Sequence, residues 1–161
     1  MTLLNSLSRR NLILLAGLGS AALFLGALFF QFVIGIEPCT MCFWQRWPHR
    51  IGIGLGLVGL AFPRAIVAWL GGLNMLVSTG LAMYHTGVER HWWLGPTTCT
   101  SRGVDLSAAS DCGLLDPDCG APIVLCDQIA WDLFGLSMAN YNVIISLGLA
   151  VIWVMAARRK A

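Results

Sequence analysis

The sequence predicts an all-α membrane protein, a bundle of four transmembrane helices with two non-cytoplasmic loops and both termini in the cytoplasm. Composition is the first observation: 57% of the 161 residues are hydrophobic and 11% are charged, whereas a soluble domain carries about 25% charged residues. The second is a mean hydropathy of +0.74. The third is that the few charges lie between long apolar stretches. Together these exclude a soluble enzyme core and a disordered chain.

Four stretches carry almost no formal charge, and we predict spans at about 12–35, 43–62, 65–86 and 137–157 within one membrane domain, 1–161. A spanning helix needs about 20 apolar residues. The first, third and fourth stretches meet this requirement alone. The second does so only if its helix begins near Cys42 to Arg46, because Cys42 to Pro63 then extends about 33 Å.

The charged residues are sorted by sign, which predicts the orientation. Cations without nearby acids occupy the termini and the second connection: Arg9, Arg10, Arg64, Arg158, Arg159 and Lys160. All acids lie in or beside the first and third connections: Glu37, Glu89, Asp105, Asp111, Asp116, Asp118, Asp127 and Asp132. The long loop, about 87–136, is therefore expected outside the cytoplasm. The first stretch is too long for the apolar region of a signal peptide and lacks a clear cleavage site, so we expect a retained helix.

All six cysteines are predicted to lie on the non-cytoplasmic side: Cys39, Cys42, Cys99, Cys112, Cys119 and Cys126. This distribution indicates an oxidising compartment such as a bacterial periplasm. Six cysteines allow fifteen pairings, so spacing alone does not fix the connectivity.

Cys39-Thr40-Met41-Cys42 is the most informative segment. Its spacing suits reversible dithiol chemistry, in which one thiolate attacks and the neighbouring thiol resolves. A structural disulfide and half of a metal site are the alternatives. Zinc is the weaker one, because a second closely spaced Cys or His pair is missing, and no metal site is predicted.

Arg46 lies one helical turn beyond Cys42 if a helix begins there. A helix N-terminus and a guanidinium both favour the Cys42 thiolate. A cationic pocket with aromatic neighbours at the membrane surface suits a membrane-dissolved oxidant such as a quinone. The alternative is that Arg46 only extends to the interface. Pro48 fits a first turn if the helix begins near Arg46, and otherwise implies a kink.

Three segments resemble the disulfide bond formation protein B (DsbB) family of quinone-coupled membrane thiol oxidases. They are Glu-Pro-Cys-Thr-Met-Cys-Phe-Trp-Gln-Arg at 37–46, Tyr84-His85 before Pro-Thr-Thr-Cys at 96–99, and Cys-Asp-Gln-Ile-Ala-Trp-Asp-Leu-Phe-Gly-Leu-Ser-Met at 126–138. The resemblance covers nearly the whole chain.

The resemblance implies a relay of cysteine pairs in the inner membrane. A DsbA-like thioredoxin-fold protein of the periplasm would attack a Cys99–Cys126 disulfide, and Cys126 would exchange with Cys39. The electrons would pass through Cys39–Cys42 to ubiquinone or menaquinone, which the sequence does not distinguish. Arg46 would stabilise the Cys42 thiolate and the quinone oxyanion, and His85, matched across a one-residue gap, would lie near the quinone or be an interfacial residue without a role.

Cys112 and Cys119 depart from the family's four-cysteine pattern. They would form a structural third disulfide or join the relay, and Cys119–Cys126 is an alternative pairing. Residues 123–136 mix apolar and acidic residues at roughly helical spacing, so we expect an amphipathic segment along the membrane surface.

Two other functional interpretations remain. One is a non-catalytic four-helix adaptor or channel subunit with a disulfide-stapled outer loop. The other is a vitamin K epoxide reductase-like oxidase, which the position of Cys39 and Cys42 after the first span argues against. No nucleic-acid-binding patch is present in the sequence, and the expected partners are the thioredoxin-fold protein, the quinone and the lipid bilayer.

Overall fold

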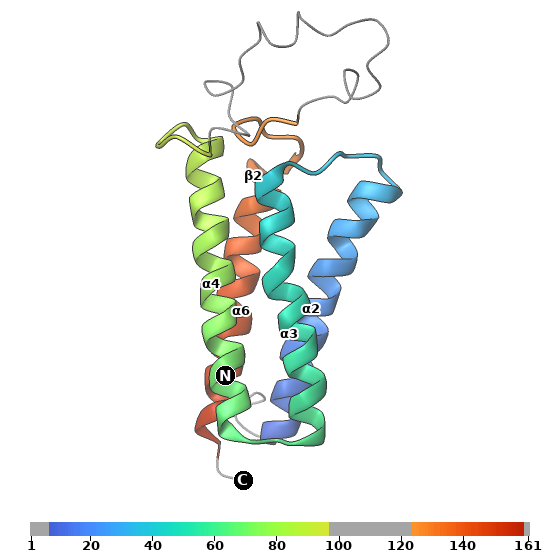
Figure 1. Cartoon of the computed structure of the whole chain (residues 1–161), viewed down its shortest axis with the longest axis vertical. Coiled ribbons are helices and arrows are strands. Elements are labelled where there is room, and N and C mark those ends of the chain that lie inside the picture. Colours follow the sequence, from blue (N-terminus) through green and yellow to red (C-terminus); the bar gives the residue numbers. More distant parts are fainter. Residues whose placement is uncertain (1–6, 97–123, 160–161) are drawn as a thin grey trace, which may run out of the picture.

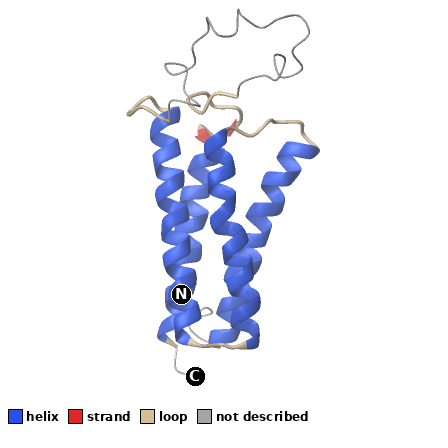
Figure 2. Ribbon diagram, in the orientation of Figure 1, coloured by secondary structure: helices blue, strands red, loops and turns tan. Residues whose placement is uncertain are grey.

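The computed structural model describes residues 7–96 and 124–159, which form four long helices and one short β-hairpin (Figure 1). The helices are α2 (Arg9–Phe32), α3 (Thr40–Ala61), α4 (Ala65–Glu89) and α6 (Met138–Arg158). The hairpin strands are β1 (Asp132–Leu133) and β2 (Leu136–Ser137). The helices run side by side along one long axis (Figure 2). The predicted helical architecture is therefore confirmed.

Three of these helices, α2, α4 and α6, are long and apolar enough to cross a membrane. In the described part of the chain α3 does not meet that standard, because Gln45, Arg46, His49 and Arg50 lie in its first half. Its 22 residues extend about 33 Å, which matches the length of a span. Composition, and not length, therefore separates α3 from the other three helices.

α3 begins earlier than the predicted residue 43, so that Cys39 is its N-cap. Pro48 consequently lies inside the helix and not in its first turn. Proline has no backbone N–H, so one carbonyl in the preceding turn loses its helical partner. The side chain of Asn74 in α4 donates to the Pro48 carbonyl at 2.7 Å and joins the two helices at this point.

α4 continues three residues past its predicted end, to Glu89. His91 then adopts φ +56°, the N–H of His91 donates to the Val88 carbonyl, and the N–H of Trp92 donates to the Gly87 carbonyl. This is a Schellman motif, in which a left-handed residue closes the helix. The additional residues place Glu89 on the same helical face as His85, and both side chains belong to the site described below.

Small residues let the helices approach closely. Gly52 and Gly56 of α3 face α2: a Cβ on Gly56 would lie 3.1 Å from Gly17 Cα, and one on Gly52 would lie 2.8 Å from Ser20 Oγ. On α4, Gly71 lies against the ring of Trp153, which is fully buried in the core. Close backbone contact of this kind is the usual role of small residues in membrane helices.

Both described ends of the chain lie at one end of the bundle (Figure 1). Arg9 at the start of α2 donates to the carbonyls of Pro63, Ala156 and Arg159. It therefore joins the α3–α4 connection to the C-terminal end of α6. The connection between α2 and α3 and the β-hairpin lie at the opposite end, where the C-terminal part of α2 diverges from the other helices.

The described residues between 124 and 137 form no helix, so the expected helical spacing there was misleading. They form turns and the antiparallel hairpin, in which Asp132 pairs with Ser137 and Leu133 with Leu136. Phe134 and Gly135 make its two-residue turn with φ of +53° and +75°. Positive φ at both turn positions gives the twist that a tight hairpin requires. The remainder of the expected surface segment, residue 123, lies outside the described residues.

Candidate active site

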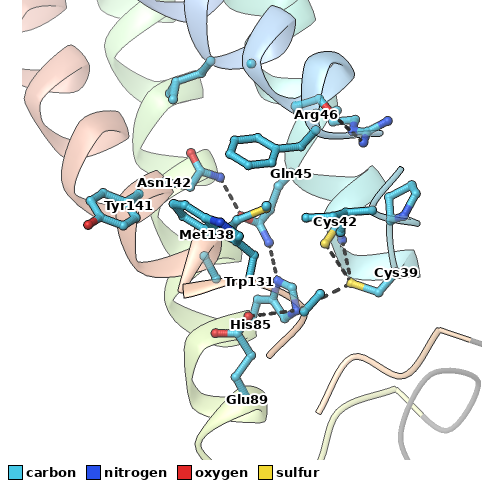
Figure 3. A pocket seen from close by; sticks show the side chains of 18 of the residues that line it. Cys39, Cys42, Gln45, Arg46, His85, Glu89, Trp131, Met138, Tyr141 and Asn142 are labelled. Carbon is cyan, nitrogen blue, oxygen red and sulfur yellow. Dashed lines mark hydrogen bonds and ion pairs between the residues drawn. The ribbon is translucent and has the colours of Figure 1, made fainter. Parts of the chain in front are cut away.

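The first turn of α3 brings two thiols together (Figure 3). Cys39 Sγ lies 2.9 Å from Cys42 Sγ and also accepts a hydrogen bond from the Cys42 backbone N–H at 3.3 Å. A disulfide would require a separation of about 2.05 Å, and both residues are free thiols. The Cys39 side chain donates to the Cys42 sulfur across this contact. The structure therefore presents the pair in its reduced form.

The two thiols are not equivalent. The hydrogen bond to Cys42 and burial both raise the pKa of Cys39 far above its usual range, and only 5% of Cys39 is exposed. Cys39 therefore keeps its proton and directs it toward Cys42. The amide groups at the start of a helix favour negative charge in its first turn, where Cys42 lies. The arrangement favours the thiolate at Cys42.

Arg46 lies one turn below Cys42 and is buried rather than extended to the membrane surface, with 7% of its area exposed. Its guanidinium donates to Gln31 Oε1 at 2.5 Å and to the Ala27 carbonyl at 3.4 Å, both on α2. It also interacts electrostatically with Cys42. Because α2 holds it, the positive charge is fixed beside the thiol pair.

His85 reaches the pair from α4, which the sequence could not establish. Its Nε2 lies 3.6 Å from Cys39 Sγ, and its Nδ1 lies 2.6 Å from Gln45 Nε2. Only 3% of His85 is exposed. The imidazole is thus a buried partner of the thiols and not an interfacial side chain.

A chain of polar side chains fixes how His85 is held. Asn142 Nδ2 on α6 donates to Gln45 Oε1 at 2.6 Å, so the Gln45 amide nitrogen faces His85 Nδ1 and donates to it. His85 Nδ1 is then an acceptor, and the ring proton lies on Nε2, facing the thiols. Asn142 Oδ1 in turn accepts from Ser146 at 2.8 Å and lies 3.0 Å from His49 Nε2.

Glu89 is a buried carboxylate beside this histidine. Its Oε1 lies 3.8 Å from His85 Nε2, and its Oε2 accepts a hydrogen bond from the Ser137 hydroxyl. Ser137 is also the N-cap of α6, where its side chain accepts from the Asn140 N–H. One serine therefore connects the end of α4 to the start of α6 at the site.

An apolar cavity of about 340 Å³ opens beside these groups. It lies between α2 and the other helices, near the end where α2 diverges. Its wall includes apolar side chains of α2 and α6 and the polar groups described above. The lining residues include Leu23, Ala27, Phe30, Cys42, Arg46, His85, Trp131, Met138 and Ile145. Such a cavity, with a few polar groups converging on one side, is typical of a small-molecule site.

Four of the predicted site residues, Cys39, Cys42, Arg46 and His85, therefore lie together. Cys126 is fully buried in an apolar cluster that also contains Cys39. It is disulfide-bonded, and its partner is neither Cys39 nor Cys42, which are free. Cys99, Cys112 and Cys119 lie outside the described residues.

The sequence analysis missed Gln45, His49, Glu89 and Asn142. A signal for two of them was present: Cys42, Gln45, Arg46 and His49 are spaced as one face of a helix whose other residues, apart from Thr40 and Arg50, are apolar. A polar face directed into a membrane bundle is typical of a functional site. Glu89 follows His85 by four residues, the spacing of one helical face. Nothing in the sequence connects Asn142 with Gln45, which lies 97 residues earlier.

Comparison with known proteins agrees with this geometry. The sequence model of the family described as "DsbB: Disulfide bond formation protein DsbB" matches residues 9–156. A disulfide bond formation protein B from Azoarcus sp. (strain BH72) is 32% identical over 162 residues, covering 94% of this chain and 95% of the relative. That from Shewanella sp. (strain MR-4) is 30% identical over 147 residues, covering 89% and 83%. No solved structure matches. The chain therefore belongs to the DsbB family and is a membrane protein of disulfide bond formation.

Proposed function

We propose that the protein is a protein-dithiol:quinone oxidoreductase that regenerates the disulfide of a DsbA-like thiol oxidase and passes the electrons to a membrane quinone. The observation that carries this proposal is the position of a reduced Cys39–Cys42 pair at the wall of an apolar cavity that also contains Arg46 and His85. An electron donor, a fixed positive charge and a space for an apolar acceptor adjoin one another. This arrangement is the minimum that dithiol oxidation within a membrane requires.

The topology that we propose has four spans, with both termini in the cytoplasm. α3 is then a span, shielded by α2 and α4, whose polar face lines the cavity and does not meet lipid. The location of Arg9, Arg64 and Arg158 at one end of the bundle supports a cytoplasmic assignment for that end. The connection that precedes α3 and the long loop, about 87–136, would lie in the periplasm of a bacterium, above the inner membrane.

The entry of electrons would use Cys99 and Cys126. A reduced thioredoxin-fold partner attacks the Cys99–Cys126 disulfide, forms a mixed disulfide with Cys99 and leaves as the oxidised protein, so the loop pair gains two electrons and two protons. The Cys126 thiolate then attacks an oxidised Cys39–Cys42 pair at Cys39. Re-formation of Cys99–Cys126 leaves Cys39 and Cys42 reduced. The burial of Cys126 in the cluster that contains Cys39 supports this exchange.

Within the site each residue has a separate role. Cys42 is the thiolate that faces the acceptor, and Cys39 is the resolving thiol that closes the disulfide. Arg46 stabilises negative charge on Cys42 and on an acceptor oxygen. His85 holds a proton on Nε2 near the thiols and transfers protons between them and the cavity. Gln45 and Asn142 are positioning residues, because they fix which nitrogen of His85 carries that proton.

A quinone head group fits the cavity. The cavity volume of about 340 Å³ lies in the range of about 300–1,000 Å³ that small-molecule sites occupy, and Arg46 and His85 offer donors to carbonyl oxygens. When bound, ubiquinone or menaquinone supplies the oxidising power by accepting two electrons and two protons. The residues that would hold it are Cys42, Arg46 and His85.

The test is quinone reduction by purified protein in detergent, with a reduced thioredoxin-fold protein as donor and Cys42→Ser as the control. We expect turnover in the wild type and none in Cys42→Ser. The competing interpretation, a stapled adaptor or channel subunit without catalysis, predicts no turnover with either quinone in well-folded protein. It also predicts that Arg46→Ala has no effect on any redox property.

A further inference from the structure

The reduced site gathers three side chains that are metal ligands. Cys39 Sγ, Cys42 Sγ and one imidazole nitrogen of His85 all lie within 4.8 Å of one another. They come from the start of α3 and the last turns of α4, and His85 is 46 residues from Cys39 in the sequence. Two thiolates and an imidazole form a ligand set that suits zinc.

The spacing of these atoms is close to that of a tetrahedral zinc site. Zinc–sulfur and zinc–nitrogen bonds of about 2.3 and 2.0 Å place tetrahedral sulfur and nitrogen ligands about 3.5 Å apart. The observed separation of Cys39 Sγ and His85 Nε2 is 3.6 Å. The two sulfurs, now 2.9 Å apart, must separate to about 3.8 Å. Once both thiols have lost their protons, their mutual repulsion drives the sulfurs in that direction.

The surroundings contain the supporting groups that a zinc site needs. A histidine that binds zinc through Nε2 donates its Nδ1–H to an acceptor. The Gln45 amide lies 2.6 Å from His85 Nδ1. Zinc at Nε2 requires the ring proton on Nδ1, and a joint rotation of the Gln45 and Asn142 amides presents the Gln45 oxygen to that proton while it keeps the hydrogen bond between the two amides. Glu89 Oε1, 3.8 Å from His85 Nε2, is a carboxylate that can supply the fourth ligand. Ser137 holds the other oxygen of that carboxylate.

We propose that Cys39, Cys42 and His85 form a zinc site in the reduced protein, with Glu89 or water as the fourth ligand, and that bound zinc blocks reoxidation of the pair. Binding releases the two thiol protons to solvent and transfers no electrons. The oxidised pair offers no thiolates and does not bind the ion. The blocking effect rests on the proposed function, whereas the binding itself does not.

The experiment measures Co(II) and Zn(II) binding to the full-length protein in detergent, after reduction with a phosphine and without quinone. Co(II) is titrated first, because its thiolate charge-transfer absorption counts bound sulfur, and Zn(II) then displaces it. Every variant keeps Cys99, Cys112, Cys119 and Cys126, so binding to those cysteines is a common background. The variants are Cys42→Ser, His85→Ala and Gln45→Glu, and the matched control is His91→Asn. His91 is exposed, and its left-handed φ is one that asparagine tolerates.

We expect Cys42→Ser to lose one equivalent of bound ion and His85→Ala to weaken that equivalent at least about tenfold. His91→Asn should bind as the wild type does. Gln45→Glu should tighten binding by about tenfold, because a carboxylate is a stronger acceptor for His85 Nδ1–H. An unfolded variant cannot produce that increase. Equal binding in wild type and His85→Ala, or weaker binding in Gln45→Glu, would overturn the proposal.

Failure of this inference and failure of the proposed function are distinguishable. Quinone turnover by metal-free protein, with no site that depends on His85, would retain the function and remove the zinc site. A metal site that depends on His85, in a protein without quinone turnover, would retain the zinc site and remove the proposed function. If both proposals hold, zinc should inhibit turnover with the affinity measured in the titration, and a chelator should restore it.

Discussion

Gly71 tests the packing of α4 against α6 that supports the site. A Cβ at this position would lie 2.3 Å from Cδ2 and 2.5 Å from Cε3 of Trp153. The Trp153 side chain is fully buried and packs among the core residues of α2, α4 and α6. The indole therefore cannot move aside without displacing its neighbours. We expect Gly71→Ala to destabilise the bundle.

The magnitude follows from the contact distances. Non-bonded carbon atoms are in favourable contact at separations of about 3.5–4.0 Å. The Trp153 ring or helix α4 must therefore shift by about 1 Å or more. Overpacking of this kind costs about 1–3 kcal/mol, and replacement of glycine by alanine in a helix returns up to about 1 kcal/mol. Gly80→Ala, in the same helix, has no neighbour within 4 Å and should show the gain alone. The difference between the two variants, about 1–3 kcal/mol, is the packing cost.

The assay is thermal unfolding in detergent, followed by the helical circular dichroism signal. At about 2–4 °C per kcal/mol for a chain of this size, Gly71→Ala should unfold about 2–12 °C below Gly80→Ala. In a Trp153→Leu background the Gly71→Ala cost should shrink, because the two residues are in contact. Equal unfolding temperatures for the two alanine variants, or an unchanged cost in that background, would refute the packing argument.

Three further perturbations probe the site. Arg46→Lys keeps the charge but cannot reproduce the fixed guanidinium contacts, so we expect the KM for quinone to rise about tenfold or more. The control is Arg64→Lys, at an exposed position at the far end of the bundle, which should leave the KM unchanged. Steady-state quinone reduction measures both values, and an unchanged KM in Arg46→Lys would contradict the role of Arg46. Asn142→Leu removes the partner that orients the Gln45 amide. In steady-state quinone reduction we expect kcat to fall by a larger factor than the KM for quinone changes. Wild-type values of both constants would contradict the positioning role of Asn142. Ser137→Ala removes the N-cap of α6 and a hydrogen bond to the buried Glu89 carboxylate. We expect it to lower the free energy of unfolding by about 1–3 kcal/mol. An unchanged unfolding temperature would show that solvent can replace the Ser137 hydroxyl.

The helical architecture was predictable because apolar runs of membrane length leave few alternatives. Helix boundaries were less so: α4 extends past the expected position because Gly87, Val88 and His91 close it with a Schellman motif, a feature of backbone geometry. The hairpin at Asp132 to Ser137 was missed because its apolar and acidic residues also fit a helical period. Phe134 has a positive φ, a backbone conformation that bulky residues rarely adopt, so the residue type did not indicate a turn there.

The candidate site was predictable where its residues are close in sequence. Cys39, Cys42 and Arg46 lie within the first two turns of one helix, so spacing alone places them together. His85 and Asn142 reach them from other helices, and only tertiary packing reveals those contacts. The sequence therefore indicated the Cys39–Cys42 pair, but neither the orientation of His85 nor its proximity to both sulfurs.

The most direct test of the account is a single turnover without any partner protein. Protein in which Cys99, Cys112, Cys119 and Cys126 are replaced by alanine is used, so that no loop thiol can reduce the Cys39–Cys42 pair again. It is reduced and mixed anaerobically with one equivalent of quinone, and quinol formation is followed while the Cys39 and Cys42 thiols are counted by alkylation and mass spectrometry. The account predicts that one quinol forms for each Cys39–Cys42 disulfide, and that neither forms in Cys42→Ser. Cys39 and Cys42 that stay reduced, or quinol that forms equally in Cys42→Ser, would contradict it.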